Sequence, residues 1–299
     1  MPNTCVILNP TARGERARRL IERLRAMCGD VFLCATSTAG EAEHLARNAV
    51  AEGYDQIVAA GGDGTINEVV NGIAGSDVAL GLMPIGTMNV FANEMGLPAN
   101  NLGRCWDVVR AGHCRWIDLP LANKKHFVQL AGVGLDAQAV KETSLTFKRN
   151  FGPLSYLVCA AQIAARKPPR LVVATKEGKT LEGSFVLIGN GRLYGGRFPF
   201  FKHAVIDDGL LDVLVFKQLG YVELIKYLQN VIFASEITTP EVEYFQTGRL
   251  RVSSDEEVPV EIDGELTGVC PVEFEISSRR LRVLAPAPWN RSRRSIESS

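Results

Sequence analysis

Apolar and polar positions alternate along the first 120 residues in two different periods. Short apolar runs predict strands at 5–8, 31–34, 56–60 and 78–83. Segments whose apolar residues fall on one face predict helices at 16–27, 41–52 and 66–73. Strands that alternate with helices of about 10–15 residues are typical of βαβ units around a parallel sheet. We therefore predict an α/β domain over residues 1–119.

From about Trp116 onward the pattern changes to short β-type runs separated by turns that contain Gly and Pro. Such runs lie at 116–119, 126–130, 171–175, 184–188, 211–216, 242–245, 250–252, 258–262, 272–276 and 281–284. Two helical stretches, Leu154–Ala165 and Val222–Phe233, interrupt them. Many short strands predict a sandwich or barrel, so we expect a β-rich domain over residues 120–285. The Pro-, Ser- and Arg-rich residues 286–299 are expected to form a loose tail.

The composition narrows the classes of function. The 299 residues include 33 basic and 33 acidic side chains, and this zero net charge argues against a dedicated nucleic-acid binder. The seven cysteines form no CxxC motif and the four histidines are scattered, which favours a reducing cytoplasm over a disulfide framework or zinc site. The longest apolar stretch, at 154–165, is shorter than the about 20 residues that span a bilayer.

The strongest candidate for chemistry is the sequence Gly-Gly-Asp-Gly-Thr at 61–65, between a predicted strand and a predicted helix. Glycines allow the chain to turn sharply and to approach a ligand closely. The free N–H groups and the positive dipole end of the following helix attract anions such as phosphate. The Asp63 carboxylate could reach a phosphate-bound Mg²⁺. The alternative is a tight turn in which Thr65 caps the helix.

A second motif, Ile85-Gly86-Thr87-Met88-Asn89, also follows a strand and opens a helix. Thr87 either caps this helix or binds a phosphate, and Asn89 binds a base or a phosphate. Two glycine-rich strand ends in one parallel sheet can contribute to one cleft. The segment Asp207-Asp208-Gly209 offers oxygen ligands that suit Mg²⁺ or Ca²⁺, with an ordinary Asp-Gly turn as the alternative. By itself, Asp263-Gly264-Glu265 is typical of a hairpin turn.

Together these motifs resemble the catalytic signature of the diacylglycerol kinase and sphingosine kinase superfamily, most closely that of the soluble bacterial diacylglycerol kinase-like lipid kinases. The likeness covers nearly the whole chain and includes segments at 9–10, 36–42, 131–137, 195–196, 204–213 and 262–265. It implies a nucleotide domain similar to NAD kinase and phosphofructokinase, followed by a β-sandwich. It also implies that the last strand, Arg279–Leu284, returns to the first domain. The chain departs from the family at Arg13-Gly14-Glu15 and at Val90, where the family has Gly-Lys and Asp.

The resemblance implies ATP and Mg²⁺ as cofactors and assigns roles to named residues. The residues assigned to the nucleotide are Asn9, Pro10, Thr11, Thr36, Gly61, Gly62, Asp63, Gly64, Thr65, Asn67, Glu68 and Thr87. A structural Mg²⁺ would be held by the Asp208 side chain and the carbonyls of Val205 and Leu210. Asp263 and Glu265 would lie near the acceptor hydroxyl, and one of them would act as the base that phosphoryl transfer requires. The sequence leaves open which.

We therefore predict an ATP-dependent lipid kinase whose acceptor is diacylglycerol and whose product is phosphatidic acid. Its partners would be the lipid and, by peripheral and transient contact, the inner face of the membrane, from the cytoplasm. Another lipid alcohol (a sphingoid base, ceramide or monoacylglycerol) and an NAD kinase-like soluble substrate are the alternatives. A non-catalytic regulator would show a decayed glycine loop or a lost acidic pair, and both are intact. Whether the chain forms a homodimer is left open.

Overall fold

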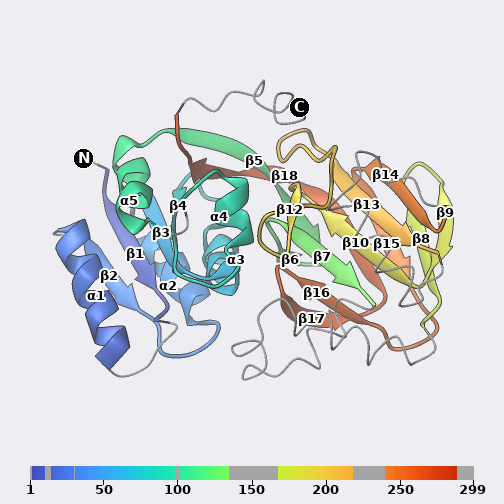
Figure 1. The fold of residues 1–299 in the computed structure, drawn as a ribbon, viewed down its shortest axis with the longest axis horizontal. Coiled ribbons are helices and arrows are strands. Elements are labelled where there is room, and N and C mark those ends of the chain that lie inside the picture. The colour runs from blue at the N-terminus through green and yellow to red at the C-terminus, as the bar shows by residue number, and fades with distance from the viewer. Residues whose placement is uncertain are drawn as a thin grey trace. The chain divides into compact units, whose positions relative to one another are not determined.

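The computed structural model describes residues 2–10, 15–29, 31–98, 101–134, 168–217 and 240–287. The chain forms two compact units (Figure 1). Unit 1 consists of Met1–Trp116 and Leu281–Ser299, and unit 2 of Ile117–Arg280. Both helices predicted for the second half, most of the predicted tail and Thr11 lie outside the described residues.

Unit 1 is built on a parallel sheet. Its strands are β1 (Thr4–Leu8), β2 (Phe32–Ala35), β3 (Gln56–Gly61) and β4 (Ala79–Pro84), in the order β2-β1-β3-β4. The end of β18 (Val272–Leu284) adds a further parallel strand, because Arg282 pairs with Ala79 and Val283 with Leu80. This pairing confirms that the last strand returns to the first domain.

Helices cover this sheet on both faces, as a buried parallel sheet requires. They are α1 (Glu15–Cys28), α2 (Glu41–Ala51), α3 (Asp63–Ile73), α4 (Val90–Glu94) and α5 (Leu102–Ala111). Leu24 of α1 and Trp106 of α5 belong to the same buried cluster as Val6 and Val58 of the sheet. The three predicted helices are confirmed, although α3 begins at Asp63, three residues before its predicted start.

Helix α5 was not predicted, although its ends carry ordinary signals. The side chain of Asn101 accepts a hydrogen bond from the Arg104 N–H at 3.1 Å and so caps the start of the helix. Gly112, with φ 69°, ends it in the left-handed conformation that favours glycine.

Because the strands of unit 1 are parallel, their carboxyl ends meet at one edge of the sheet. Three backbone hydrogen bonds hold the segments that leave these strands close together. The Asn9 N–H donates to the Ala60 carbonyl at 2.9 Å, and the Ile85 N–H to the Gly61 carbonyl at 2.9 Å. The Thr36 N–H donates to the Leu8 carbonyl at 2.8 Å. The predicted nucleotide motifs of unit 1 therefore begin at the same edge.

Unit 2 is an antiparallel β-sandwich. Its strands, together with the two that pass between the units, are β5 (Cys114–Ala122), β6 (Lys125–His126), β7 (Leu130–Val133), β8 (Leu171–Thr175), β9 (Thr180–Gly183), β10 (Phe185–Gly189), β11 (Leu193–Tyr194), β12 (Phe198–Pro199), β13 (Leu211–Phe216), β14 (Val242–Thr247), β15 (Arg249–Ser253), β16 (Pro259–Ile262), β17 (Glu265–Val269) and β18. One sheet has the order β14-β13-β10-β7-β16-β17, and β18, β15, β8 and β9 follow one another in the other. Val186 and Ile262 of the first sheet share a buried cluster with Val173 and Phe274 of the second. The predicted fold class is confirmed.

Two strand predictions were wrong in their extent. The runs at 272–276 and 281–284 form the single strand β18, because the polar residues between them continue the extended chain on an exposed surface. The run at 126–130 is interrupted between β6 and β7. There the N–H groups of Val128 and Gln129 donate to a carboxylate, that of Asp263, instead of to a neighbouring strand.

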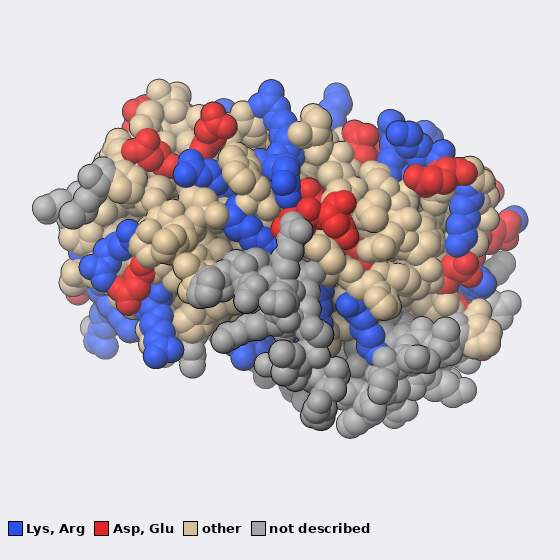
Figure 2. Space-filling model, turned by 90° about the horizontal axis from the view of Figure 1, so that it is seen from above, with Lys and Arg blue, Asp and Glu red and all other residues tan. Residues whose placement is uncertain are grey.

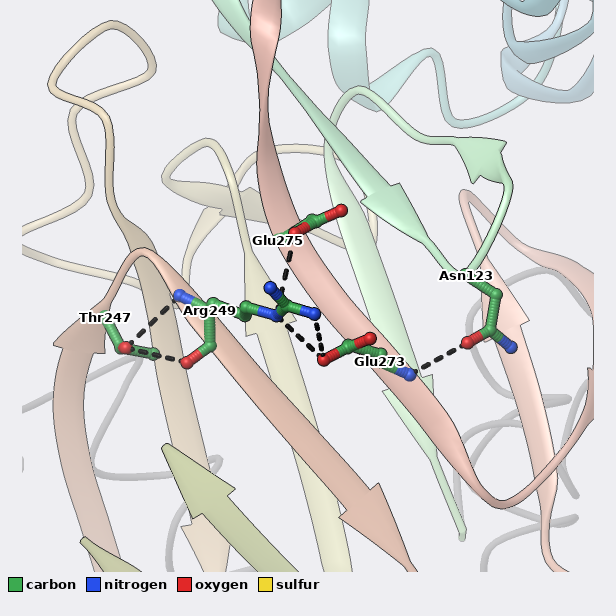
Figure 3. A network of polar contacts seen from close by, with 5 residues as sticks. All are labelled: Asn123, Thr247, Arg249, Glu273 and Glu275. Carbon is green, nitrogen blue, oxygen red and sulfur yellow. Dashed lines mark hydrogen bonds and ion pairs between the residues drawn. The ribbon is translucent and has the colours of Figure 1, made fainter. Parts of the chain in front are cut away.

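A polar network on the outer face of unit 2 joins β15 to β18 (Figure 3). The Arg249 guanidinium contacts Glu273 at 2.6 Å and Glu275 at 3.6 Å. The Glu273 N–H donates to Asn123 Oδ1 at 3.0 Å, and the Thr247 hydroxyl donates to the Arg249 carbonyl at 3.0 Å. Since the charged side chains are exposed, each ion pair contributes at most about 1 kcal/mol, and the network secures strand register more than stability.

Candidate active site

Two glycine-rich loops touch at the carboxyl edge of the unit 1 sheet. A Cβ added to Gly86 would lie 2.6 Å from the Gly62 Cα, and a Cβ added to Gly62 would lie 3.4 Å from the Gly86 Cα. Only glycine at position 86 allows this approach of one backbone to the other. Gly62 is the residue before α3, and the first N–H groups of any α-helix have no acceptor within the helix. This edge therefore offers backbone donors to an anion.

The Asp63 carboxylate organises the second loop. It accepts the Phe91 N–H at 3.4 Å and also bonds the backbone N–H groups of Asn89 and Val90, at the start of α4. Burial raises the pKa of Asp63, and these backbone hydrogen bonds oppose the rise. Asn89 has φ 49°, and its Nδ2 donates to the Gly86 carbonyl at 2.7 Å. The contact of Asp63 with a metal stays a prediction.

Asn9 and Thr65 meet across the first loop. The Asn9 Nδ2 donates to Thr65 Oγ1 at 3.0 Å. Thr65 is buried in the first turn of α3, and the N-cap position belongs to Gly62, so the alternative in which Thr65 caps the helix is wrong. A Cβ on Gly61 would lie 2.5 Å from the Thr65 Cβ, which explains glycine at that position.

Thr36 and Thr87 differ in accessibility. Thr36 is buried at the end of β2, with Pro10 half-buried after β1. Thr87 is exposed and does not cap α4, whose N-cap is Asn89. Its hydroxyl is therefore accessible to a ligand at this edge.

Two predicted nucleotide residues of α3 are engaged with the protein itself. Asn67 is buried, and its Oδ1 accepts the Asn71 Nδ2 at 3.1 Å. The Glu68 carboxylate accepts the Gly40 N–H at 2.8 Å and the Ala42 N–H at 3.0 Å, at the beginning of α2. The Asn67 side chain therefore makes a contact within α3, and the Glu68 side chain joins α3 to α2.

In unit 2, Asp263 and Gly264 form a two-residue turn between β16 and β17. Their φ values of 48° and 86° and the pairing of Ile262 with Glu265 are those of a tight hairpin. The hairpin interpretation is confirmed, but the Asp263 side chain does more than turn the chain.

The Asp263 carboxylate binds three successive backbone N–H groups. Its Oδ2 accepts Val128 at 2.9 Å, and its Oδ1 accepts Gln129 at 3.0 Å and Leu130 at 3.1 Å. These bonds engage both carboxylate oxygens and tie the turn to the segment that leads into β7. Glu265, half-buried at the start of β17, is the stronger candidate for a base.

The Asp208 loop gathers negative charge. Asp208 Oδ1 accepts the Leu210 N–H at 3.1 Å, and the Asp208 N–H donates to the Val205 carbonyl at 3.2 Å. Burial raises the pKa of Asp208, and the carboxylates of Asp118 and Asp207 add to the rise. A hard cation would relieve this crowding, so the oxygen-rich loop fits Mg²⁺. No three His, Cys, Asp or Glu side chains in the described ranges form a metal cluster, so carbonyl or water ligands would be needed.

Two residues that connect these segments of unit 2 were not predicted from the sequence. Asp118 is buried in β5; its Oδ2 accepts the Gly209 N–H at 2.6 Å, and its Oδ1 lies 3.4 Å from Arg280 Nε. The fully buried Asn190 donates through Nδ2 to the carbonyls of Asp118 at 3.2 Å and Val128 at 2.9 Å. Asp118 is a single polar residue among apolar neighbours and Asn190 lies between two glycines, and both signals are too common to identify a site.

The surface carries charges of both signs. Lys and Arg side chains are interspersed with Asp and Glu over the described part of the face in Figure 2, in keeping with the zero net charge. In the part of the chain that the structure describes, no helix is both long and apolar enough to cross a membrane.

Comparison with known protein families identifies both halves of the chain. Residues 3–121 match the diacylglycerol kinase catalytic domain, and residues 129–285 match the YegS C-terminal NAD kinase beta sandwich-like domain. The second match alone spans more than half of the chain.

Curated relatives align over almost their full length. A protein of Bacillus subtilis (strain 168) named diacylglycerol kinase is 29% identical over 294 residues, which cover 96% of this chain and 97% of the relative. Another of that name, from Staphylococcus carnosus (strain TM300), is 28% identical over 289 residues and 94% of both chains.

A crystal structure of a diacylglycerol kinase from Bacillus anthracis (strain Sterne) has a similar fold. It matches with a TM-score of 0.77 and 25% identity, over 96% of this chain and 97% of that one. A second structure from the same organism, 24% identical, has a TM-score of 0.79 over 96% and 98% of the two chains.

Proposed function

The chain belongs to the diacylglycerol kinase family of ATP-dependent lipid kinases, and we propose that its acceptor is the hydroxyl of a diacylglycerol, which it converts to phosphatidic acid. The observation that carries the kinase chemistry is the contact between the two glycine loops at Gly62 and Gly86. It supports the proposal because the start of α3 has backbone N–H groups that can bind a polyphosphate. The lipid acceptor is suggested by the names of the relatives.

ATP phosphates bind at the amino end of α3. Gly62, Gly64 and Thr87 lie around them, while Asn9 holds the first turn through Thr65. Mg²⁺ bound with ATP would neutralise charge that develops on the phosphates. The Asp63 carboxylate already accepts N–H groups at the start of α4. It would therefore bind this cation through a lone pair that those hydrogen bonds leave available, or through a bridging water.

The chemical step requires a base near the acceptor. The lipid hydroxyl oxygen forms a bond to the γ-phosphorus, the bond from that phosphorus to the bridging oxygen breaks, and ADP leaves. Glu265 takes the hydroxyl proton, and Asp263 holds the turn that presents Glu265. A positioned general base accelerates such reactions by about 10²–10⁴-fold.

The Asp208 loop binds a structural Mg²⁺ through the Asp208 side chain and the carbonyls of Val205 and Leu210. An ion that binds only the folded protein raises its stability. Added Mg²⁺ without nucleotide should therefore raise the melting temperature of the wild type but not of Asp208→Ala. An equal response of the two proteins would exclude this site.

The protein acts from the cytoplasm and contacts the membrane peripherally and transiently, because its substrate lies in the bilayer. Sedimentation with lipid vesicles, with and without diacylglycerol, tests this contact. A homodimer remains a prediction, and light scattering during size-exclusion chromatography measures it.

The substrate is tested by incubating the purified protein with labelled ATP and a panel of acceptors. Diacylglycerol, monoacylglycerol, ceramide, a sphingoid base and NAD are compared, and the labelled products are separated. We expect labelled phosphatidic acid with diacylglycerol. Preferential labelling of another lipid would identify that lipid as the acceptor instead of diacylglycerol. Labelling of NAD alone would contradict the assignment as a lipid kinase.

A further inference from the structure

The Glu68 side chain joins two helices of unit 1. Glu68 lies on the second turn of α3, and its two oxygens accept the N–H groups of Gly40 and Ala42 at 2.8 and 3.0 Å. These N–H groups lie at the beginning of α2, where the helix itself supplies no acceptor. A carboxylate there is favoured by the charged hydrogen bonds and by the helix dipole. The carboxylate therefore works as a clamp between α3 and α2.

The two helices are also in close contact beyond this clamp. A Cβ added to Gly72 of α3 would lie 2.5 Å from the Glu43 carbonyl oxygen and 2.6 Å from the Ala46 Cβ. Ala42 and Ala46 are fully buried. Small residues thus fix the spacing of the helices, and Glu68 fixes the position of the first turn of α2 relative to α3.

The clamp holds the segment that connects β2 to α2. That segment begins at Thr36, whose N–H extends the ladder to Leu8, and ends at Gly40, which has φ 82°. Between them, Glu41 Oε2 accepts the N–H groups of Ser37 at 2.7 Å and Thr38 at 3.1 Å. Glu41 shapes this turn locally, and Glu68 ties it to α3, whose amino end is the proposed phosphate site.

The same contact decides which helix end can attract phosphate. The beginning of α2 would present free N–H groups and a positive dipole end, but the Glu68 carboxylate fills that place with negative charge. The beginning of α3 keeps its donors for a ligand. We propose that Glu68 is a positioning residue for nucleotide binding: it holds the Thr36–Gly40 segment against α3 and keeps α2 closed to anions, without touching the nucleotide itself. This inference rests on the proposed ATP site.

The test uses Glu68→Ala and Glu68→Gln in the full chain. Glutamine keeps one acceptor oxygen but turns an NH₂ group toward a backbone donor, so its effect should be intermediate. The matched control is Glu43→Gln, which removes a carboxylate from α2 that pairs with Arg47 at 2.6 Å. ATP affinity is measured by calorimetry without lipid, so a failure of the lipid assignment leaves this measurement valid.

We expect Glu68→Ala to raise the Kd for ATP at least tenfold, which corresponds to about 1.4 kcal/mol. The KM for ATP should rise in parallel, with kcat within about threefold, because the chemical groups are untouched. Amide hydrogen exchange should accelerate at Gly40 and Ala42. The Glu43→Gln control should change none of these.

Two results would overturn the proposal. One is an unchanged ATP affinity in a Glu68 variant whose circular dichroism shows a native fold; if the alanine variant does not fold, the glutamine variant decides. The other is a fall in kcat at unchanged KM for ATP, because Glu68 would then act on the reacting groups or their metal.

Discussion

At the strand ends of unit 1, the candidate groups for binding a ligand are backbone N–H groups and small hydroxyls, whereas in unit 2 they are carboxylates on turns. Unit 1 uses the carboxylates of its motif to hold structure: Asp63 binds N–H groups at the start of α4, and Glu68 those at the start of α2. In unit 2, Asp263 is used in the same way, and Glu265 and Asp208 are the carboxylates proposed for chemistry and metal binding.

This difference matches the two halves of a phosphoryl transfer. Phosphate oxygens need donors, which a helix start supplies, and an acceptor hydroxyl needs a base, which a carboxylate supplies. It also teaches that an acidic residue in a motif has two possible uses. A carboxylate that accepts several backbone N–H groups, as Asp263 does, holds local structure.

The sharpest test of the comparison is Glu265→Gln, with the largest expected effect. The amide keeps the shape of the side chain and cannot accept the proton, so turnover should fall by about 10²–10⁴-fold. The Kd for ATP and the melting temperature should change little. Near-normal phosphorylation of the lipid would remove Glu265 from the mechanism.

Asp263→Asn should instead affect stability. The NH₂ group would face backbone donors that the carboxylate now accepts, and hydrogen bonds to a charged group contribute about 1.5–3 kcal/mol each. We expect the free energy of unfolding, measured with urea, to fall by about 2–3 kcal/mol. If Asp263→Asn keeps its stability but loses turnover, Asp263 is the base and the division between the two carboxylates is wrong.

Gly86→Ala tests the donor side of the comparison. The new Cβ would lie 2.6 Å from the Gly62 Cα, so the two loops must separate. We expect a loss of about 1–3 kcal/mol in stability, as for other overpacked sites, together with weaker ATP binding. Gly62→Ala is the matched variant: its Cβ has 3.4 Å of space, so stability should be nearly retained while ATP binding falls. Equal stability of the two variants would contradict the loop contact.

The smallest expected effect concerns Glu41 and pH. The N–H of Ser37 holds the pKa of Glu41 below its ordinary value of 4.5. A carboxylate whose pKa is lowered by folding stabilises the folded turn fully at pH values above its ordinary pKa. This contribution is lost as the pH falls through the lowered pKa of the folded state. Amide exchange at Ser37 and Thr38 should therefore accelerate below about pH 4.5 relative to the intrinsic rate. In Glu41→Gln it should be fast at neutral pH already.

Much of the fold could be predicted because its signals are local. The periodicity of residues 41–52 identifies α2, and the turn residues Asp263-Gly264 identify the hairpin. One error occurred where a distant residue intervened. The expected strand is interrupted at Val128–Leu130 because Asp263, at least 133 residues further along the chain, accepts their N–H groups. No local sequence pattern predicts this contact.

By itself the sequence determined the order of the elements, the two glycine loops and the set of acidic residues, because turn chemistry and hydrophobic period act over a few neighbouring positions. Only the tertiary structure decided which of those acids are occupied. Glu68 and Gly40 are 28 residues apart, and Asp263 and Val128 are 135 apart. A carboxylate forms hydrogen bonds with whichever N–H groups the fold brings within about 3 Å. That proximity depends on the packing of whole helices and strands.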